Sequence, residues 1–277
     1  MNVSLCGQVV AITGAARGIG RTTAEALISC GARVAIGDID ETGLVETAAT
    51  IGAKHHARVD VTDAESFRRF LAVTETCLGP VDVLINNAGI MPAGPFLDES
   101  DAVTRRIFEI NTIGFVIGTK RALELMTPRR RGHIVNMAST MGEASVPGLI
   151  SYNASKAAVI RFTDAARLEF RSSGVQFTTV LPGAVNTELA TGVTGPKGIR
   201  TVEPREVADA VVGALESGRS NPRIYVPRSF GLLLQAQRFL PLRIAEAANR
   251  LMGAETAILR DSDLASRRAY RDRVARS

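Results

Sequence analysis

The chain has 277 residues, 45% of them hydrophobic and 22% charged, and is long enough to bury a substantial core in one large domain. Its first residues lack a basic segment followed by a long apolar run, and no stretch reaches the roughly 20 apolar residues of a membrane-spanning helix. These features argue against a secreted or membrane-spanning protein and favour a cytoplasmic one. Cys6, Cys30 and Cys77 are widely spaced, which favours reduced thiols over a disulfide framework or a metal site.

The net charge of +5 comes from the C-terminal part of the chain. Residues 1–227 carry 23 Lys and Arg against 23 Asp and Glu, whereas residues 228–277 carry 10 against 5. In this tail the arginines alternate with acids, and few aromatic side chains lie between them. We therefore expect a solvated helical face and no nucleic-acid partner.

Strand and helix patterns alternate along the first four fifths of the chain. Short runs rich in Val and Ile predict strands at residues 9–13, 33–37, 57–61 (the weakest), 81–86, 133–137, 175–181 and 223–226. Apolar residues at helical spacing predict helices at residues 21–30, 66–77, 103–126, 154–170 and 204–215. This alternation predicts a parallel sheet covered by helices on both faces. Residues 190–203 contain three glycines and a proline and predict a mobile loop.

The segment TGAARGIG directly follows the first predicted strand and places Gly14, Gly18 and Gly20 where a helix begins. Glycines at such a turn let the backbone approach a pyrophosphate, and the helix N-terminus supplies N–H groups and partial positive charge. The spacing is G-x-x-x-G-x-G, which differs from the common G-x-G-x-x-G. A glycine turn without a cofactor is the alternative, but its position between strand and helix favours dinucleotide binding.

Asp38 lies at the end of the second predicted strand, roughly 20 residues beyond the glycine turn, where an acid can bind the adenosine ribose hydroxyls. A 2′-phosphate would meet a like charge there, which favours NAD over NADP. Arg17, inside the turn, argues the other way because it could pair with that phosphate. Asp60 and Val61 end the third predicted strand and could border the adenine, although a surface acid is common at such a position.

Polar groups follow several other strands at the edge where open α/β sheets bind ligands. NNAG ends at Gly89, Ser139 closes the fifth strand, and PGAVNT follows the sixth. Tyr152 comes thirteen residues after Ser139, with Lys156 one helical turn later. Taken singly, each has an ordinary structural explanation, such as a turn, a helix cap or an exposed helix face. Their joint occurrence in this order favours a catalytic site.

Through these motifs, residues 5–227 resemble the short-chain dehydrogenase/reductase family. The resemblance implies a Rossmann-like doubly wound α/β sheet of about seven strands, with residues 1–227 as the NAD(P)-binding catalytic domain and residues 228–277 as a helical extension. It implies that Tyr152 transfers the proton, Lys156 holds the nicotinamide ribose, Ser139 orients the substrate oxygen and Asn111 completes a proton relay. The implied cofactor site comprises Gly14, Arg17, Gly18, Ile19, Gly20, Asp38, Asp60, Val61, Asn87, Ala88, Gly89, Tyr152, Lys156, Pro182, Gly183, Val185 and Thr187.

The spacing of Tyr152 and Lys156 also has a physical logic of its own. A free tyrosine has a pKa of about 10 and is a poor base near neutrality. An ammonium one turn away, together with an oxidised nicotinamide, would favour the phenolate and lower that pKa. Tyr152 could then accept the proton of an alcohol while hydride leaves the same carbon for the cofactor.

Apolar residues beside the catalytic segments indicate the substrate class. We expect the substrate to face Ile90, Met91, Met141, Val146, Pro147, Leu149 and Leu189. This set favours a hydrophobic secondary alcohol or ketone, of steroid, terpenoid or lipid type, although core packing explains several members equally well. We expect the three histidines, His55, His56 and His133, to lie away from the cleft, and we expect no metal.

The tail and the assembly leave alternatives open. The apolar and basic mixture of residues 228–277 fits packing against the same or another subunit, peripheral membrane contact, or a loose segment. The family resemblance implies a homodimer or homotetramer formed through helices at residues 103–126 and 152–170. Two further functions compete with NAD-dependent alcohol oxidation: NADP-dependent carbonyl reduction, and non-catalytic redox sensing by a dinucleotide-binding protein.

Overall fold

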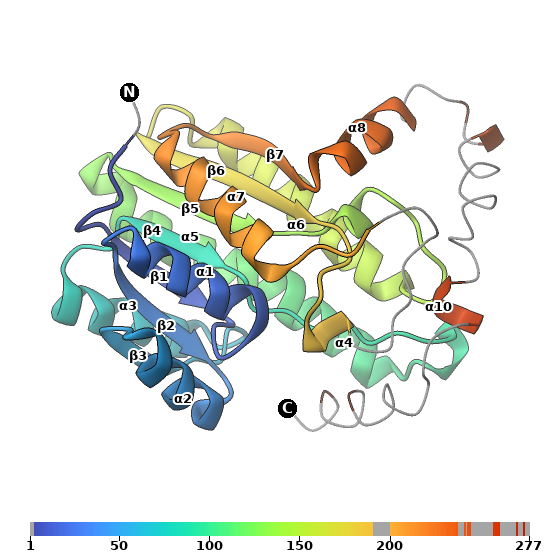
Figure 1. Ribbon diagram of the computed structural model, residues 1–277, viewed down its shortest axis with the longest axis horizontal. Helices are drawn as coiled ribbons and strands as arrows, with labels where there is room; N and C mark the ends of the chain where they lie inside the picture. Colours follow the sequence, from blue (N-terminus) through green and yellow to red (C-terminus); the bar gives the residue numbers. More distant parts are fainter. Residues whose placement is uncertain are drawn as a thin grey trace.

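The computed structural model describes residues 3–190, 200–237, 241, 243–244, 257–260, 270 and 274 (Figure 1). Seven parallel strands form one sheet in the order β3-β2-β1-β4-β5-β6-β7. The strands are β1 (Val9–Thr13), β2 (Arg33–Asp38), β3 (His55–Arg58), β4 (Val83–Asn86), β5 (Gly132–Met137), β6 (Val175–Pro182) and β7 (Asn221–Val226). The order reverses between β1 and β4, which identifies a doubly wound, Rossmann-like sheet and confirms the predicted fold class.

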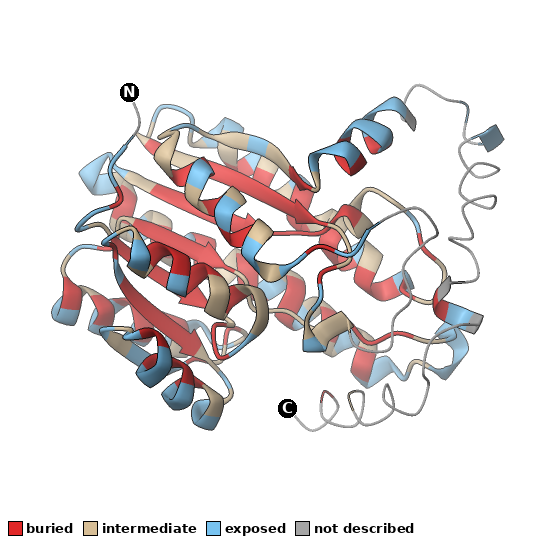
Figure 2. Cartoon of the chain, in the orientation of Figure 1, coloured by how far each residue is buried: buried red, intermediate tan, exposed pale blue. Residues whose placement is uncertain are grey.

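Helices cover both faces of the sheet. The long helices are α1 (Gly18–Ser29), α2 (Glu41–Ile51), α3 (Ala64–Leu78), α4 (Asp101–Phe108), α5 (Gly114–Arg129), α6 (Ile150–Glu169), α7 (Pro204–Glu216) and α8 (Arg228–Gln237). The short elements are η1 (Phe96–Asp98), η2 (Glu109–Ile113), η3 (Thr140–Gly142), η4 (Glu188–Ala190) and α10 (Ala257–Arg260). The sheet is thus a middle layer whose central strands are mostly red in Figure 2, whereas the outer helix faces are largely exposed.

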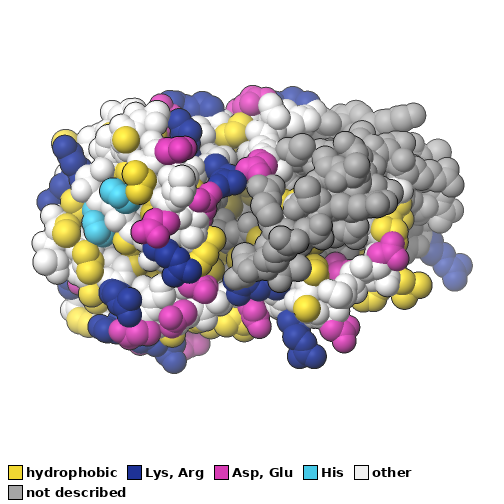
Figure 3. Space-filling view, turned by 90° about the horizontal axis from the view of Figure 1, so that it is seen from below, with side chains coloured by type: hydrophobic (Ala, Val, Ile, Leu, Met, Phe, Trp, Pro, Cys, Tyr) yellow, Lys and Arg dark blue, Asp and Glu magenta, His cyan; other side chains and the backbone are white. Residues whose placement is uncertain are grey.

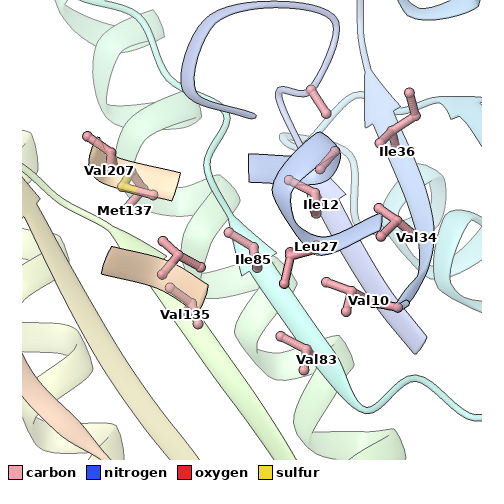
Figure 4. Packing of buried hydrophobic residues seen from close by; sticks show 14 of the residues in the cluster. Val10, Ile12, Leu27, Val34, Ile36, Val83, Ile85, Val135, Met137 and Val207 are labelled. Carbon is pink, nitrogen blue, oxygen red and sulfur yellow. The ribbon is translucent and has the colours of Figure 1, made fainter. Parts of the chain in front are cut away.

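Alternate residues of each strand pack into different cores because successive side chains point to opposite faces. On one face, Val10 and Ile12 of β1 join Leu27 of α1 and Val207 of α7 (Figure 4). On the other face, Val9 and Ala11 join side chains of α3 and α5. Burial on both faces explains why the central strands are continuous apolar runs in the sequence.

At the β2-β3 edge, the structure differs from the prediction in two elements. α2 was not predicted, because three threonines and Gly43 weaken its helical pattern; the Asp40 side chain caps it by accepting the Gly43 N–H at 3.1 Å. β3 spans His55–Arg58, whereas the prediction was residues 57–61. As an edge strand, β3 is only half buried and begins with two histidines. The buried residues Val59 and Val61 follow it, and they shifted the predicted strand toward the C-terminus.

The helix predicted at residues 103–126 is divided by a π-helical turn, η2. Its extra residue per turn reorients the chain between α4 and α5, and such turns often occur at functional sites. Asn111 lies within this turn and is fully buried. The periodicity of the sequence continues across the turn, which is why a single helix was predicted.

The described parts of the tail contact the main body. Phe230 and Leu234 of α8 are buried beside Leu181 and Tyr225, and Ile258 of α10 is buried against the segment before α6. The division at residue 227 stays a prediction. The predicted loop at residues 190–203 falls largely on residues 191–199, outside the described residues, as do most of positions 245–277. Within the described part, no helix has the length and apolar character needed to cross a membrane.

The described surface mixes charges of both signs. On the face seen in Figure 3, acidic and basic side chains lie interspersed among polar and apolar ones. A partly buried charge cluster lies at the β7 edge: Arg223 of β7 donates to both carboxylate oxygens of Asp164 at 2.7 Å and to Glu143 at 3.0 Å. Tyr225 adds a hydrogen bond to Glu143 at 2.8 Å. This cluster fastens the edge strand to α6 and to the turn after η3.

Replacing Phe67 with Ala should destabilise the protein by about 3–5 kcal/mol, because a large buried side chain leaves both its transfer energy and a cavity behind. Phe67 of α3 is completely buried under the sheet. Urea unfolding followed by circular dichroism would measure the change. Val73→Ala on the same helix, at a side chain that is 39% exposed, is the matched control and should change stability by less than about 1 kcal/mol.

Candidate active site

The glycine turn packs directly against the segment after β4. Gly14 has φ +66°, and a Cβ there would lie 2.5 Å from the Cα of Ala88. Gly18 also has positive φ, and a Cβ on it would meet Thr187 of the PGAVNT segment at 3.5 Å. The turn therefore needs glycine both for its backbone conformation and for close approach of three segments.

Asn87 fixes this arrangement. Its side-chain Nδ2 donates to the carbonyl oxygens of Thr13 and Gly14 at 3.1 and 2.8 Å, and its backbone N–H donates to Thr13 Oγ1 at 3.2 Å. Gly20 lies beneath the turn, where a Cβ would meet Asn87 Nδ2 at 2.6 Å. A larger residue at position 20 would therefore push the turn away from Asn87.

Asp38 closes the far end of the glycine turn. It accepts the Ala16 N–H at 2.9 Å and the Asp40 N–H at 3.1 Å. Burial raises the pKa of Asp38 above its ordinary value, against the lowering effects of the Ala16 N–H and Arg17. Arg17 is paired with Asp40 and, at 2.9 Å, with Glu188, so its guanidinium is already held by two carboxylates.

Asp60 and Val61 lie beyond the end of β3 and border the cavity that the glycine turn and Asp38 also line. The predicted position at the strand end is therefore wrong by two residues for Asp60, although the predicted side of the sheet is right. Burial tends to raise the pKa of Asp60, but hydrogen bonds from the Thr62 hydroxyl and N–H outweigh it and lower that pKa.

α6 carries Tyr152 and Lys156 on its buried face. A chain of buried amides and hydroxyls fixes this helix to the sheet: Asn86 Nδ2 donates to Asn136 Oδ1 at 2.9 Å, and Asn136 Nδ2 donates to Thr163 Oγ1 at 2.9 Å. Buried polar groups that satisfy one another in this way specify one arrangement of strand and helix. The position of α6 on the sheet, and so the direction in which Tyr152 and Lys156 point, depends on these hydrogen bonds.

Burial raises the pKa of Tyr152 to about 12, while its hydrogen bond with the Ser139 side chain lowers it and charge on Tyr270 raises it further. Lys156 is itself buried, and burial lowers its pKa to about 7. The lowering of the Tyr152 pKa by Lys156 together with an oxidised nicotinamide stays a prediction. Lys156 Nζ donates to the Met137 carbonyl at 3.0 Å and lies 5.9 Å from the centre of the Tyr152 ring.

Ser139 and Asn111 occupy different positions around this pair. Ser139 Oγ accepts the Met141 N–H at 3.1 Å, and its hydroxyl faces Tyr152 in the cavity wall. Asn111 instead bonds both backbone groups of Ile90 at 2.8 Å and the Ser155 hydroxyl at 3.2 Å. A Cβ on Gly89 would lie 3.2 Å from Asn111 Oδ1 and 3.5 Å from Lys156 Nζ, so both side chains approach Gly89.

One cavity of about 660 Å³ joins these groups. The predicted cofactor and catalytic residues that line it are Gly14, Arg17, Gly18, Ile19, Asp38, Asp60, Val61, Asn87, Ala88, Gly89, Ser139, Tyr152, Lys156, Pro182, Gly183, Val185 and Thr187. The predicted apolar residues that line it are Ile90, Met91, Met141, Val146, Leu149 and Leu189. Gly20, Asn111 and Pro147 lie outside this described wall.

Sequence analysis missed other residues of the cavity wall. Asp40 and Glu188 are next to predicted residues and could have been found by extending those motifs. Ile258 and Tyr270 belong to the tail, where no motif connects them with the site. The three histidines lie outside the described wall, and burial lowers the pKa of His133 to about 4. Among the described residues, no cluster of His, Cys, Asp or Glu is suited to hold a metal ion.

Comparisons with known proteins agree with this geometry. A sequence model of the family described as short chain dehydrogenase matches residues 8–197. The chain belongs to the short-chain dehydrogenase family. It is 33% identical over 254 residues to human estradiol 17-beta-dehydrogenase 11, covering 89% of this chain and 84% of that protein. It is 32% identical over 260 residues to human 17-beta-hydroxysteroid dehydrogenase 13, covering 91% and 85%.

A solved structure shares the fold of this short-chain dehydrogenase. It is a short chain dehydrogenase/reductase from Burkholderia phymatum in complex with NAD, with a TM-score of 0.77 and 25% identity over 85% of this chain and 94% of the other. The glycine cradle at Gly14 and the Asp38 carboxylate beside it fit a nicotinamide dinucleotide. The protein is an NAD(P)-dependent oxidoreductase that acts on CH–OH groups.

The lowered pKa of Lys156 predicts a pH-dependent stability of the cofactor-free enzyme. Between pH 7 and 10.5 the unfolded chain holds the lysine proton while the folded protein has released it, so the free energy of unfolding should rise with pH in this window. In Lys156→Met the rise should be smaller by several kcal/mol. Urea unfolding at a series of pH values would measure it, and equal slopes for both proteins would contradict the burial effect.

Proposed function

We propose that this short-chain dehydrogenase interconverts a hydrophobic secondary alcohol and its ketone, with NAD as the cofactor. The observation that carries the proposal is that one cavity holds the glycine cradle and Asp38 at one end and the hydroxyls of Ser139 and Tyr152 beside apolar side chains at the other. Two relatives are named as dehydrogenases of estradiol and of 17-beta-hydroxysteroids, which are hydrophobic secondary alcohols. Apolar walls stabilise such a skeleton, whereas a sugar or acidic metabolite would lose its hydration there.

Tyr152 moves the substrate proton in this proposal. In reduction, its neutral phenol donates to the carbonyl oxygen, which its raised pKa favours. In oxidation, the phenolate accepts the alcohol proton, and the Lys156 ammonium beside it stabilises that charge. A bound nicotinamide supplies the hydride acceptor or donor at the carbinol carbon. Ser139 hydrogen-bonds the substrate oxygen and stabilises charge that develops on it.

The other site residues position these groups. Lys156 would hold the nicotinamide ribose, and Val185 and Thr187 would contact the carboxamide, as the family resemblance implies. Asn111 keeps Ile90 and the loop after β4 in place through its two backbone hydrogen bonds, and it approaches Gly89, as Lys156 Nζ does. Asn111 thereby fixes the loop beside which Lys156 lies.

NAD is favoured over NADP by the charges near the ribose. A 2′-phosphate would approach the Asp38 carboxylate, and the cation that could offset this repulsion, Arg17, is paired with Asp40 and Glu188. Carbonyl reduction with NADP would require Arg17 to bind the 2′-phosphate in competition with these two carboxylates. Non-catalytic redox sensing is disfavoured because a sensor has no use for Ser139, Tyr152 and Lys156 converging on an apolar chamber.

Pairing of copies through α5 and α6 is the assembly we propose. Ile113 and Leu168, on the segments expected to form the interface, have exposed fractions of 48% and 59%. Large apolar side chains at such positions are typical of interfaces between copies.

Tyr152→Phe should bind NAD with unchanged affinity and lose turnover by about 1,000-fold or more, because the ring remains while the proton-transfer group is removed. Fluorescence titration with NADH and steady-state oxidation of estradiol would measure the two effects. Turnover close to that of the unmodified enzyme would refute the role of Tyr152.

Asp38→Asn should lower the preference for NAD over NADP by about tenfold in kcat/KM, since removing one nearby charge repulsion changes the free energy by about 1.4 kcal/mol. The amide keeps an oxygen that can accept the Ala16 N–H. Asp209→Asn, at an exposed site of α7, controls for loss of charge alone. A higher kcat/KM with NADP in the unmodified enzyme would contradict the assignment of NAD.

A further inference from the structure

Two described residues of the tail, Ile258 and Tyr270, line the cavity that contains Ser139 and Tyr152. α10, which carries Ile258, lies on the side of the molecule toward which the strand arrows point (Figure 1). This is the edge of the sheet where the substrate end of the cavity opens. A segment far from the catalytic motifs in sequence therefore reaches the reaction centre.

Ile258 is 4% exposed and belongs to a buried apolar cluster with Met91, Val146, Leu149 and Tyr152. Each of these four partners also lines the cavity. The Ile258 side chain thus continues the apolar wall to which the Tyr152 ring belongs.

The loop before α6 is shaped to receive α10. Gly148 has φ +83°, and a Cβ there would lie 2.8 Å from Ile258 Cγ2 and 3.2 Å from Leu259 Cδ2. The Gly148 carbonyl accepts the Gly94 N–H at 3.0 Å, which joins this loop to the segment after β4. A side chain at position 148 would clash with Ile258 and displace α10.

Tyr270 contacts the segment after β4. Its hydroxyl oxygen accepts the Met91 N–H at 3.0 Å, two residues beyond the NNAG segment. It also lies close enough to Tyr152 for the two phenols to interact electrostatically. Ile258 and Tyr270 therefore both contact residues that border the reacting groups, Ile258 through apolar packing and Tyr270 through a hydrogen bond.

We propose that Ile258 and Tyr270 are specificity-determining residues that close the substrate end of the cavity and select bulky apolar alcohols over compact ones. The inference rests on the proposed function and deepens it. A rigid, multi-ring alcohol placed at Ser139 and Tyr152 extends into the chamber bounded by Ile258, whereas a single-ring alcohol leaves that surface without contact. Burial of the additional carbon atoms then favours the larger substrate.

The test compares estradiol, a bulky apolar secondary alcohol, with cyclohexanol, a compact one, in the full-length enzyme with NAD. Ile258→Ala should lower the ratio of kcat/KM for estradiol over cyclohexanol by about tenfold, because the side chain loses three carbons of contact surface. Tyr270→Phe should lower it by about threefold to fivefold through loss of the bond to Met91. The control Leu232→Ala, at a 70% exposed side chain of α8, should preserve the ratio.

An unchanged ratio in both Ile258→Ala and Tyr270→Phe would overturn the proposal. So would a parallel fall for both alcohols accompanied by a lower melting temperature, since this is the result of a purely structural role. If the unmodified enzyme oxidises neither alcohol, the proposed function fails, and the role of the two residues is then decided by calorimetric binding of estradiol. About tenfold weaker binding to Ile258→Ala supports it; equal binding, or none to the unmodified protein, overturns it.

Discussion

The side-chain amide of Asn87 joins the carboxyl ends of β1 and β4 through its bonds to the carbonyls of Thr13 and Gly14. These strands lie where the order of the sheet reverses, the point at which a doubly wound fold opens a crevice. With Asn87 in place, the glycine turn faces the loop that carries Gly89, and the two halves of the cavity become continuous. The cofactor cradle and the catalytic helix depend on this alignment.

Burial governs the pKa values of the two residues proposed to be catalytic. Tyr152 and Lys156 each favour their neutral forms, with pKa values of about 12 and about 7. A buried phenolate and a buried ammonium, formed together, would neutralise each other at close range. Charge on one side chain would therefore make charge on the other less costly. The depth of burial that sets both pKa values is a tertiary property, which sequence spacing alone could not reveal.

Much of the fold and of the cofactor site could be predicted from the sequence because both rest on local signals. Buried strands are continuous apolar runs, and the glycine turn and the Tyr152-x-x-x-Lys156 motif are short. β3 was displaced because an edge strand has only one buried face, and the π-turn at Asn111 leaves helical periodicity intact. Ile258 and Tyr270 could not be predicted, because their proximity to Tyr152 is a tertiary contact with no periodic or motif signature.

The pairing of Arg17 with Asp40 and Glu188 has a consequence for the electrostatic potential of the whole site. With Asp38, these residues place three carboxylates and one guanidinium beside the glycine turn. Their mutual pairing offsets part of the charge, and salt screens what remains within about 8–10 Å. The electrostatic potential at this mouth of the cavity is therefore set by four residues together, and its reach into solvent shortens as ionic strength rises.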